Sequence, residues 1–135
     1  MTAKFFVLVA GLALVVSLPV RAHHSFSTEY DGSKTFSVKG KVSKVEWTNP
    51  HVRFYVDVAD ASGKVMTWNM ELASPSALAR NGWTSRTLKV GDEVAVQGYA
   101  AKVAPDRGNA RSVVTADGRS LFGGAADDSA PGGAN

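Results

Sequence analysis

Cysteine is absent from this chain of 135 residues. Its absence excludes a disulfide scaffold, a thiolate metal site, a thiol nucleophile and a lipid-modified N-terminal cysteine. Hydrophobic residues make up 44% of the chain and charged residues 20%, which is typical of a globular protein. The length suffices for one ordinary domain and excludes a multidomain enzyme.

The chain also lacks a large excess of either positive or negative charge. The formal net charge is +3, from 15 Lys and Arg against 12 Asp and Glu. Lys4 and Arg21 lie in the leader described below, and without them 13 cations face 12 acidic residues, a net charge of +1. Such a balance gives no electrostatic reason to bind nucleic acid or an anionic membrane, so we expect no nucleic-acid partner.

A basic start and an apolar run open the chain. Lys4 precedes the run from Phe5 to Leu18, and Pro19-Val20-Arg21-Ala22 follows it. The run is shorter than the ~20 residues that cross a bilayer, so the pattern predicts a cleavable signal peptide over residues 1–22. We therefore expect a periplasmic protein that is not embedded in the membrane and whose first residue after processing is His23.

Alternation of apolar and polar residues predicts five strand-like runs in the processed chain. The first, over 35–47, changes phase near Gly40, which indicates a bent or bulged strand. The second and third, over 52–58 and 66–72, flank a hairpin turn at 60–63. A short helix over 74–82, a fourth strand over 94–98, a loop over 104–109 and a last strand over 111–115 with a hairpin extension at 119–122 complete the pattern.

This order of elements predicts an all-β fold with one short helix, namely a small OB-like five-stranded barrel; a small open sandwich is the alternative. We expect an N-terminal arm over 23–34, the OB-like β-barrel domain over 35–122 and a disordered Gly/Ala/Asp tail over 123–135. The predicted core consists of inward-facing residues of the strands: Phe54, Val56, Val58, Trp68, Leu72, Val94 and Val96.

The three histidines of the chain, His23, His24 and His51, all lie outside the leader. An N-terminal histidine offers its amine and imidazole together, a chelating pair that suits Cu(II). Adjacent residues of an extended chain point in opposite directions, which favours His51 over His24 as a further ligand. The sequence predicts a Cu(II) site at His23 with His24 or His51; the alternative is a mobile terminus and a turn residue bonded to backbone.

Met66 and Met70 could also bind copper, because they share one strand face with Trp68 and thioethers are soft ligands for Cu(I). Packing in a hydrophobic core is the more frequent role of such residues, and we expect it here.

OB-like barrels commonly bind ligands on their second and third strands. The outward residues there carry one aromatic ring and balanced charge, which is poor for a nucleic-acid groove. No nucleophile elbow, His-Glu-x-x-His motif or phosphate loop is present, so we expect no enzymatic activity. Two functions remain: a periplasmic metal-binding protein, or a module that binds a peptide, a glycan or a periplasmic or inner-membrane protein without metal. The candidate binding face of that module comprises Arg53, Tyr55, Asn69 and Glu71.

Several motifs of the processed chain occur together in one family. His23-His24-Ser25-Phe26 and the segment Val45-Glu46-Trp47-Thr48-Asn49-Pro50-His51 are the most distinctive. With these motifs the chain resembles a family of small exported bacterial proteins, domain of unknown function 6152, from His23 to about Leu121. The resemblance names no activity; it implies that the His-His start and the Asn-Pro-His turn belong to one module.

Overall fold

The computed structural model describes residues 26–124. The predicted signal peptide, His23, His24 and the tail beyond Gly124 lie outside this range. The elements in chain order are α1 (Phe26–Glu29), β1 (Tyr30–Glu46), β2 (Arg53–Ala59), β3 (Val65–Glu71), α2 (Pro75–Arg80), β4 (Glu93–Ala101), β5 (Arg107–Thr115) and β6 (Ser120–Phe122). Among the described residues no helix is long and apolar enough to span a membrane.

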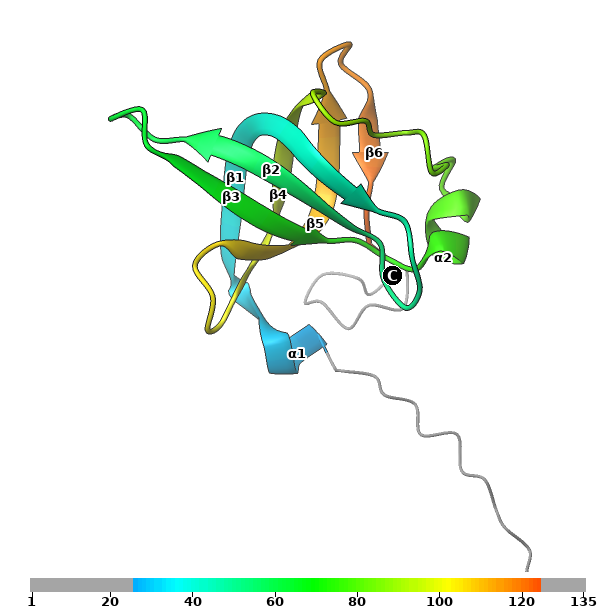
Figure 1. Ribbon diagram of the computed structural model, residues 1–135. Coiled ribbons are helices and arrows are strands. Elements are labelled where there is room, and N and C mark those ends of the chain that lie inside the picture. The colour runs from blue at the N-terminus through cyan, green and yellow to red at the C-terminus, as the bar shows by residue number, and fades with distance from the viewer. Residues whose placement is uncertain (1–25, 125–135) are drawn as a thin grey trace, which may run out of the picture.

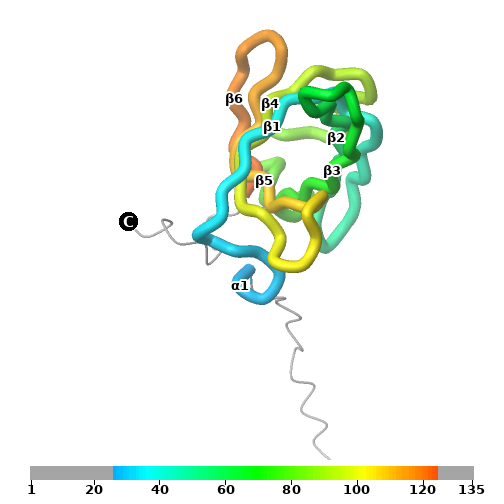
Figure 2. The backbone as a smooth tube through the Cα atoms, turned by 90° about the vertical axis from the view of Figure 1, so that its left-hand side faces the viewer, coloured from blue at the N-terminus to red at the C-terminus, as the bar shows by residue number. Residues whose placement is uncertain are grey.

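The strands form one mostly antiparallel sheet in the order β3-β2-β1-β4-β5-β6 (Figure 1). β3 also pairs with β5 in parallel, from Asn69–Arg107 to Glu71–Asn109. Hydrogen-bonded neighbours therefore form a closed circuit, β1-β2-β3-β5-β4, which is visible as a ring of strands in Figure 2. We call these five strands the closed circuit below.

β1 is long and bent, so it pairs with two neighbouring strands. Its first part, up to Lys41, pairs with β4, and its last part, from Lys41 onward, pairs with β2. A side chain at Gly40 would overlap the Asp57 carbonyl oxygen, so glycine permits the close approach of the two strands. The phase change predicted near Gly40 appears in the register as a shift between Val42 and Lys44.

The β2–β3 hairpin follows the prediction closely. The Asp60 carboxylate accepts hydrogen bonds from the backbone N–H groups of Ser62 and Lys64, and Gly63 has a φ of 84°. This turn fixes the register in which Arg53 faces Glu71 and Val56 faces Trp68. The hairpin thereby decides which side chains share the outer face.

The core lies inside the closed circuit, with α2 and its flanks at one end. Phe54, Val56, Leu72, Val94 and Val96 are buried as predicted, whereas Val58 and Trp68 are half-buried and pack against the core. Met70 is fully buried and Met66 is 44% exposed, so the two methionines do not form a pair inside the core. Trp83 is buried after α2 and donates its indole N–H to the Phe122 carbonyl oxygen at 2.9 Å.

Three predicted details are wrong. The sheet has six strands rather than five, because β6 pairs with β5 as a strand in its own right. β1 begins at Tyr30 rather than at residue 35: the Asp31-Gly32-Ser33 stretch favours a turn locally, but Tyr30 pairs with Ala101 of β4. β5 begins at Arg107, inside the predicted loop, because the parallel pairing with β3 holds that segment extended.

Candidate functional site

His51 lies just before β2, and its ring is held from one side. Its Nδ1 atom is 3.0 Å from the Leu72 carbonyl oxygen and 3.7 Å from Oε1 of Glu71. A carbonyl oxygen only accepts hydrogen bonds, so Nδ1 carries a proton, and in the neutral form of the ring the lone pair therefore lies on Nε2. The side chain is 44% exposed. This arrangement is the one that metal-binding histidines usually adopt, with the nitrogen remote from the metal bonded to a carbonyl or carboxylate.

The four residues of the candidate binding face are largely occupied with one another and with a neighbour. Arg53 donates to Oε2 of Glu71 at 2.5 Å and to Oδ1 of Asn69 at 3.2 Å. The Tyr55 hydroxyl donates to Oε2 of Glu46 at 3.1 Å, and the Lys44 ammonium holds the pKa of that Glu46 carboxyl below its usual value. The face therefore presents a satisfied polar network rather than a row of free groups.

Glu71 departs from the predicted surface position, because it is buried although it points away from the core. Its neighbour across the parallel pairing is Asn109, which is also buried. Burial and the nearby Glu71 charge raise the pKa of Tyr30, and the Arg53 charge opposes this shift. The first residue of β1 therefore lies beside the Arg53–Glu71 pair.

Two buried polar atoms beside this pair have no hydrogen-bond partner among the described residues: the Tyr30 hydroxyl and Oδ1 of Asn109. Buried polar groups are normally hydrogen-bonded, and an unmade bond costs free energy. The cluster thus combines a satisfied ion pair with an unsatisfied donor and an unsatisfied acceptor.

The start of the described chain is anchored next to this cluster. Phe26 stacks on Tyr30 with ring centroids 5.6 Å apart and meets Tyr99 edge-on at 5.4 Å. The Lys102 N–H donates to the Glu29 carbonyl oxygen at 2.9 Å. His23 precedes Phe26 by three residues, which can span at most roughly 10 Å. The covalent chain alone sets this limit, and the aromatic contacts fix Phe26, the residue from which it is counted.

The described part of the chain does not hold a complete metal site. Within residues 26–124 no three histidine, cysteine or acidic side chains come together as metal ligands would. His51 supplies one free ring nitrogen, and Glu71 is engaged by Arg53 and faces the other ring nitrogen. His23 and His24 lie outside the described residues, so the predicted ligand set stays a prediction.

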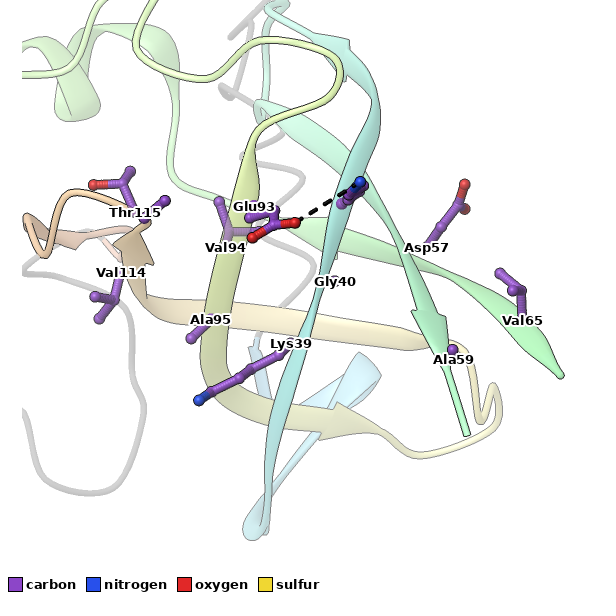
Figure 3. Close-up of a pocket in the computed structure, with 12 residues that line it drawn as sticks. Lys39, Gly40, Asp57, Ala59, Val65, Glu93, Val94, Ala95, Val114 and Thr115 are labelled. Atoms are coloured by element: carbon purple, nitrogen blue, oxygen red, sulfur yellow. Dashed lines mark ion pairs between the residues drawn. The ribbon is translucent and has the colours of Figure 1, made fainter. Parts of the chain in front are cut away.

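An open groove of about 790 Å³ lies at the other end of β2, away from His51. Figure 3 shows residues that line it on all five strands of the closed circuit: Lys39 and Gly40 of β1, Asp57 of β2, Val65 of β3, Ala95 of β4 and Val114 of β5. Lys41 and Glu93 form an ion pair at 3.8 Å beside it. None of the four residues of the predicted binding face lines this groove.

Sequence reasoning missed Tyr30 and Asn109 as members of the polar cluster. Both residues fall in segments predicted to lie outside the strands, and their contacts with Glu71 depend on pairings between distant segments. One signal could have pointed to Tyr30: an aromatic residue just after the predicted processing site, in an otherwise polar arm, needs an apolar surface to cover it.

The comparisons with known proteins point to a family rather than to an activity. No curated protein matches the chain significantly. Among solved structures, the dimeric N-terminal domain of PriB from Thermoanaerobacter tencongensis matches with 16% identity and a TM-score of 0.41, over 62% of this chain and 96% of that one. The likeness is distant, and what this chain binds does not follow from it. The profile of the family of unknown function DUF6152 matches residues 12–110. That match spans most of the chain, so this protein belongs to the DUF6152 family.

Proposed function

We propose that this protein is exported to the periplasm and binds one transition-metal ion, Cu(II) in the first place, through the amine and imidazole of His23 and Nε2 of His51. The observation that carries the proposal is the bond from Nδ1 of His51 to the Leu72 carbonyl oxygen, because it leaves Nε2 free to bind a metal. Three nitrogen donors around one ion are a set that Cu(II) favours.

The anchored chain start supports the same proposal. Phe26 is fixed against Tyr30, Tyr30 lies beside Glu71, and Glu71 lies beside His51. These contacts lead from Phe26 to His51 along one side of the domain. The segment from Phe26 back to His23 then has to span only the distance between Phe26 and the His51 ring. His24 is the alternative third ligand, which would require the terminus to kink.

The closed circuit of strands supports a finer description of the fold. We propose that it is a small OB-like barrel with β6 as a hairpin extension, because parallel pairing of β3 with β5 leaves no open sheet edge between them. In that description His51 and the chain start lie on the outer surface of the barrel, where an ion can reach them.

Copper titration of processed protein tests the metal site. Protein is taken from the periplasmic fraction, and mass spectrometry should show His23 as its first residue. We expect one Cu(II) per chain, and an affinity at least roughly tenfold weaker in His51→Ala and in a form with one extra Ala before His23. Acidification should weaken binding, because protons compete with the metal ion for the amine and imidazole nitrogens.

His24→Ala separates the two possible third ligands, since it leaves the amine of His23 and His51 in place: the affinity should stay at the wild-type value if His51 is the third ligand and should fall if His24 is. Equal affinity of the processed and Ala-extended forms would eliminate the terminal chelate. An intact leader on the exported protein would do the same.

The second candidate function is a non-catalytic module that binds a peptide, a glycan or a membrane-protein partner without metal. The groove between Lys39 and Val65 favours it, because an open depression of that size, lined by both apolar and charged side chains, is a common place for ligands. Binding that ignores chelators and depends on residues such as Lys39, or on Arg53, Tyr55 and Asn69, would support this function instead.

A further inference from the structure

The β2–β3 hairpin extends beyond the strands on either side of it. β1 pairs with β2 only up to Asp57, and β5 pairs with β3 only from Asn69 onward. Residues 58–68 therefore form a two-stranded ribbon that projects from the closed circuit, as Figure 1 shows at the upper left. Two-stranded ribbons are marginally stable in water, and a third strand stabilises them.

One edge of this ribbon carries backbone groups that no described residue pairs with. The Asn69 N–H donates away from β2, to the Asp106 carbonyl oxygen at 2.8 Å. Alternate residues of a strand direct their N–H and C=O groups to the same side, so Val65 and Thr67 also direct theirs away from β2. Among residues 26–124, β5 pairs only with Asn69 to Glu71. Val65 and Thr67 therefore have no strand partner on the side that faces away from β2.

The side chains at this edge do little to discourage another strand from pairing with it. Proteins usually protect a free edge with charged residues, proline or a bulge. Here the charged residues beside the edge are Lys64 at its outer end and Asp106 and Arg107 where β5 meets β3. The sequence Val65-Met66-Thr67-Trp68 between them contains no charge and no proline, and the β2–β3 register is continuous. Val65 is 56% exposed and Met66 is 44% exposed.

We propose that this edge of β3 pairs in antiparallel fashion with the same edge of a second copy of the chain, forming a homodimer. Pairing centred on Met66 sets Val65 opposite Thr67 of the second copy, and these are the residues with free backbone groups. Met66 then meets its own counterpart, and Lys64 faces Trp68, a favourable cation–aromatic pair.

The edge is self-complementary in the ways that such a dimer requires. No like charges face one another in this register, and the two ribbons join into a four-stranded antiparallel sheet. The processed chain carries a net charge of only +1 by sequence, so long-range repulsion between copies is small. A short peptide would gain the same few backbone bonds without the Met66 contact, which favours the second copy as occupant.

Sedimentation equilibrium of the processed chain, from micromolar to millimolar concentration and with a chelator present, tests the dimer independently of any metal. We expect the mass of the wild-type protein to rise toward twice the monomer mass. Val65→Lys should remain monomeric, because a lysine in a sheet edge disfavours pairing with another strand and the new lysines of the two copies would lie diagonally across from each other. The new lysine lies near Asp57 on the same face of the hairpin, so the fold should persist, which circular dichroism checks.

Val90→Lys is the matched control, since Val90 is 71% exposed and lies in the α2–β4 connection. It should dimerise as the wild type does. A wild-type chain that stays monomeric at every concentration overturns the proposal and leaves the edge to a strand of another protein. Equal dimerisation of the two lysine variants overturns it as well.

Discussion

At the scale of single residues, the Tyr30 hydroxyl is unusual because it is buried without a hydrogen-bond partner among the described residues. The desolvation of such a group costs roughly 1 to 3 kcal/mol. Tyr30→Phe removes the hydroxyl and keeps the ring that stacks on Phe26. We therefore expect the free energy of unfolding to stay equal or to rise by about 1 kcal/mol, as measured by urea denaturation near neutral pH.

Tyr55→Phe is the matched control for this prediction. The Tyr55 hydroxyl donates to Glu46, so the same chemical change should lower the free energy of unfolding by about 1 kcal/mol or less at this partly exposed site. A larger loss in Tyr30→Phe than in Tyr55→Phe would show that the Tyr30 hydroxyl has a partner in solution.

The same residue makes stability depend on alkaline pH. Burial and the Glu71 charge raise the pKa of Tyr30, whereas in the unfolded chain a tyrosine ionises near pH ~10. Above that pH the unfolded state loses a proton that the folded state retains, so the free energy of unfolding falls as pH rises. Tyr30→Phe should reduce this fall, which comparison of denaturation at neutral and at alkaline pH will reveal.

Some of these residue contacts could be predicted and others could not. Arg53 opposite Glu71 follows from the alternation of the two strands and from the hairpin turn that sets their register. The burial of Glu71 does not follow, because it depends on Tyr30 and on Asn109, which local patterns assign to an arm and to a loop. Local propensity is a weak guide wherever pairing with a distant segment decides the conformation.

At the scale of elements, the strands that deviate from prediction are those that close the circuit. The first three residues of β5, Arg107, Gly108 and Asn109, lie in the segment predicted as a loop. They are extended there because they pair with β3. A side chain at Gly108 would overlap the Phe36 ring, so the glycine that resembles a loop residue in the sequence is a packing requirement in the strand.

Gly98 of β4 gives a test of this close approach. A side chain there would overlap the Asn109 carbonyl oxygen of the neighbouring strand, and backbone cannot move aside as a flexible side chain can. We expect Gly98→Ala to lower the free energy of unfolding by roughly 1 to 3 kcal/mol, the usual cost of overpacking. Chemical denaturation measures the change.

Gly63→Ala is its control, because that glycine meets no atom within 4 Å of an added side chain and has a φ of 84°. Its cost is the backbone strain alone, about 1 kcal/mol. If Gly98→Ala is no more destabilising than Gly63→Ala, β4 and β5 are less closely apposed than the register indicates.

At the scale of the whole molecule, the order of elements was predictable from the sequence. The particular strand pairings that close the circuit were not. Hydrophobic alternation identifies the β2–β3 hairpin and the inward face of Phe54 and Val56. Ser74-Pro75 marks the start of α2, where the Ser74 side chain caps the helix. Which strand meets which neighbour depends on the bend of β1 and on the parallel pairing of β3 with β5. The phase change near Gly40 marks the bend in the sequence, but the parallel pairing leaves no periodic trace there.

The closed circuit makes a whole-molecule prediction, since its strands share one core. Val56 is fully buried at the centre of β2, and Val56→Asp would place an unpaired charge there. That burial costs several kcal/mol against a total stability of ~5 to 15 kcal/mol, so we expect the domain to lose its fold as one unit in circular dichroism and thermal melting. Val103→Asp makes the same change at a 94% exposed position and should melt like the wild type. A Val56→Asp protein that melts like Val103→Asp would mean that β2 faces the core with its other side, and the assignment of Arg53 and Tyr55 to the outer face would fail with it.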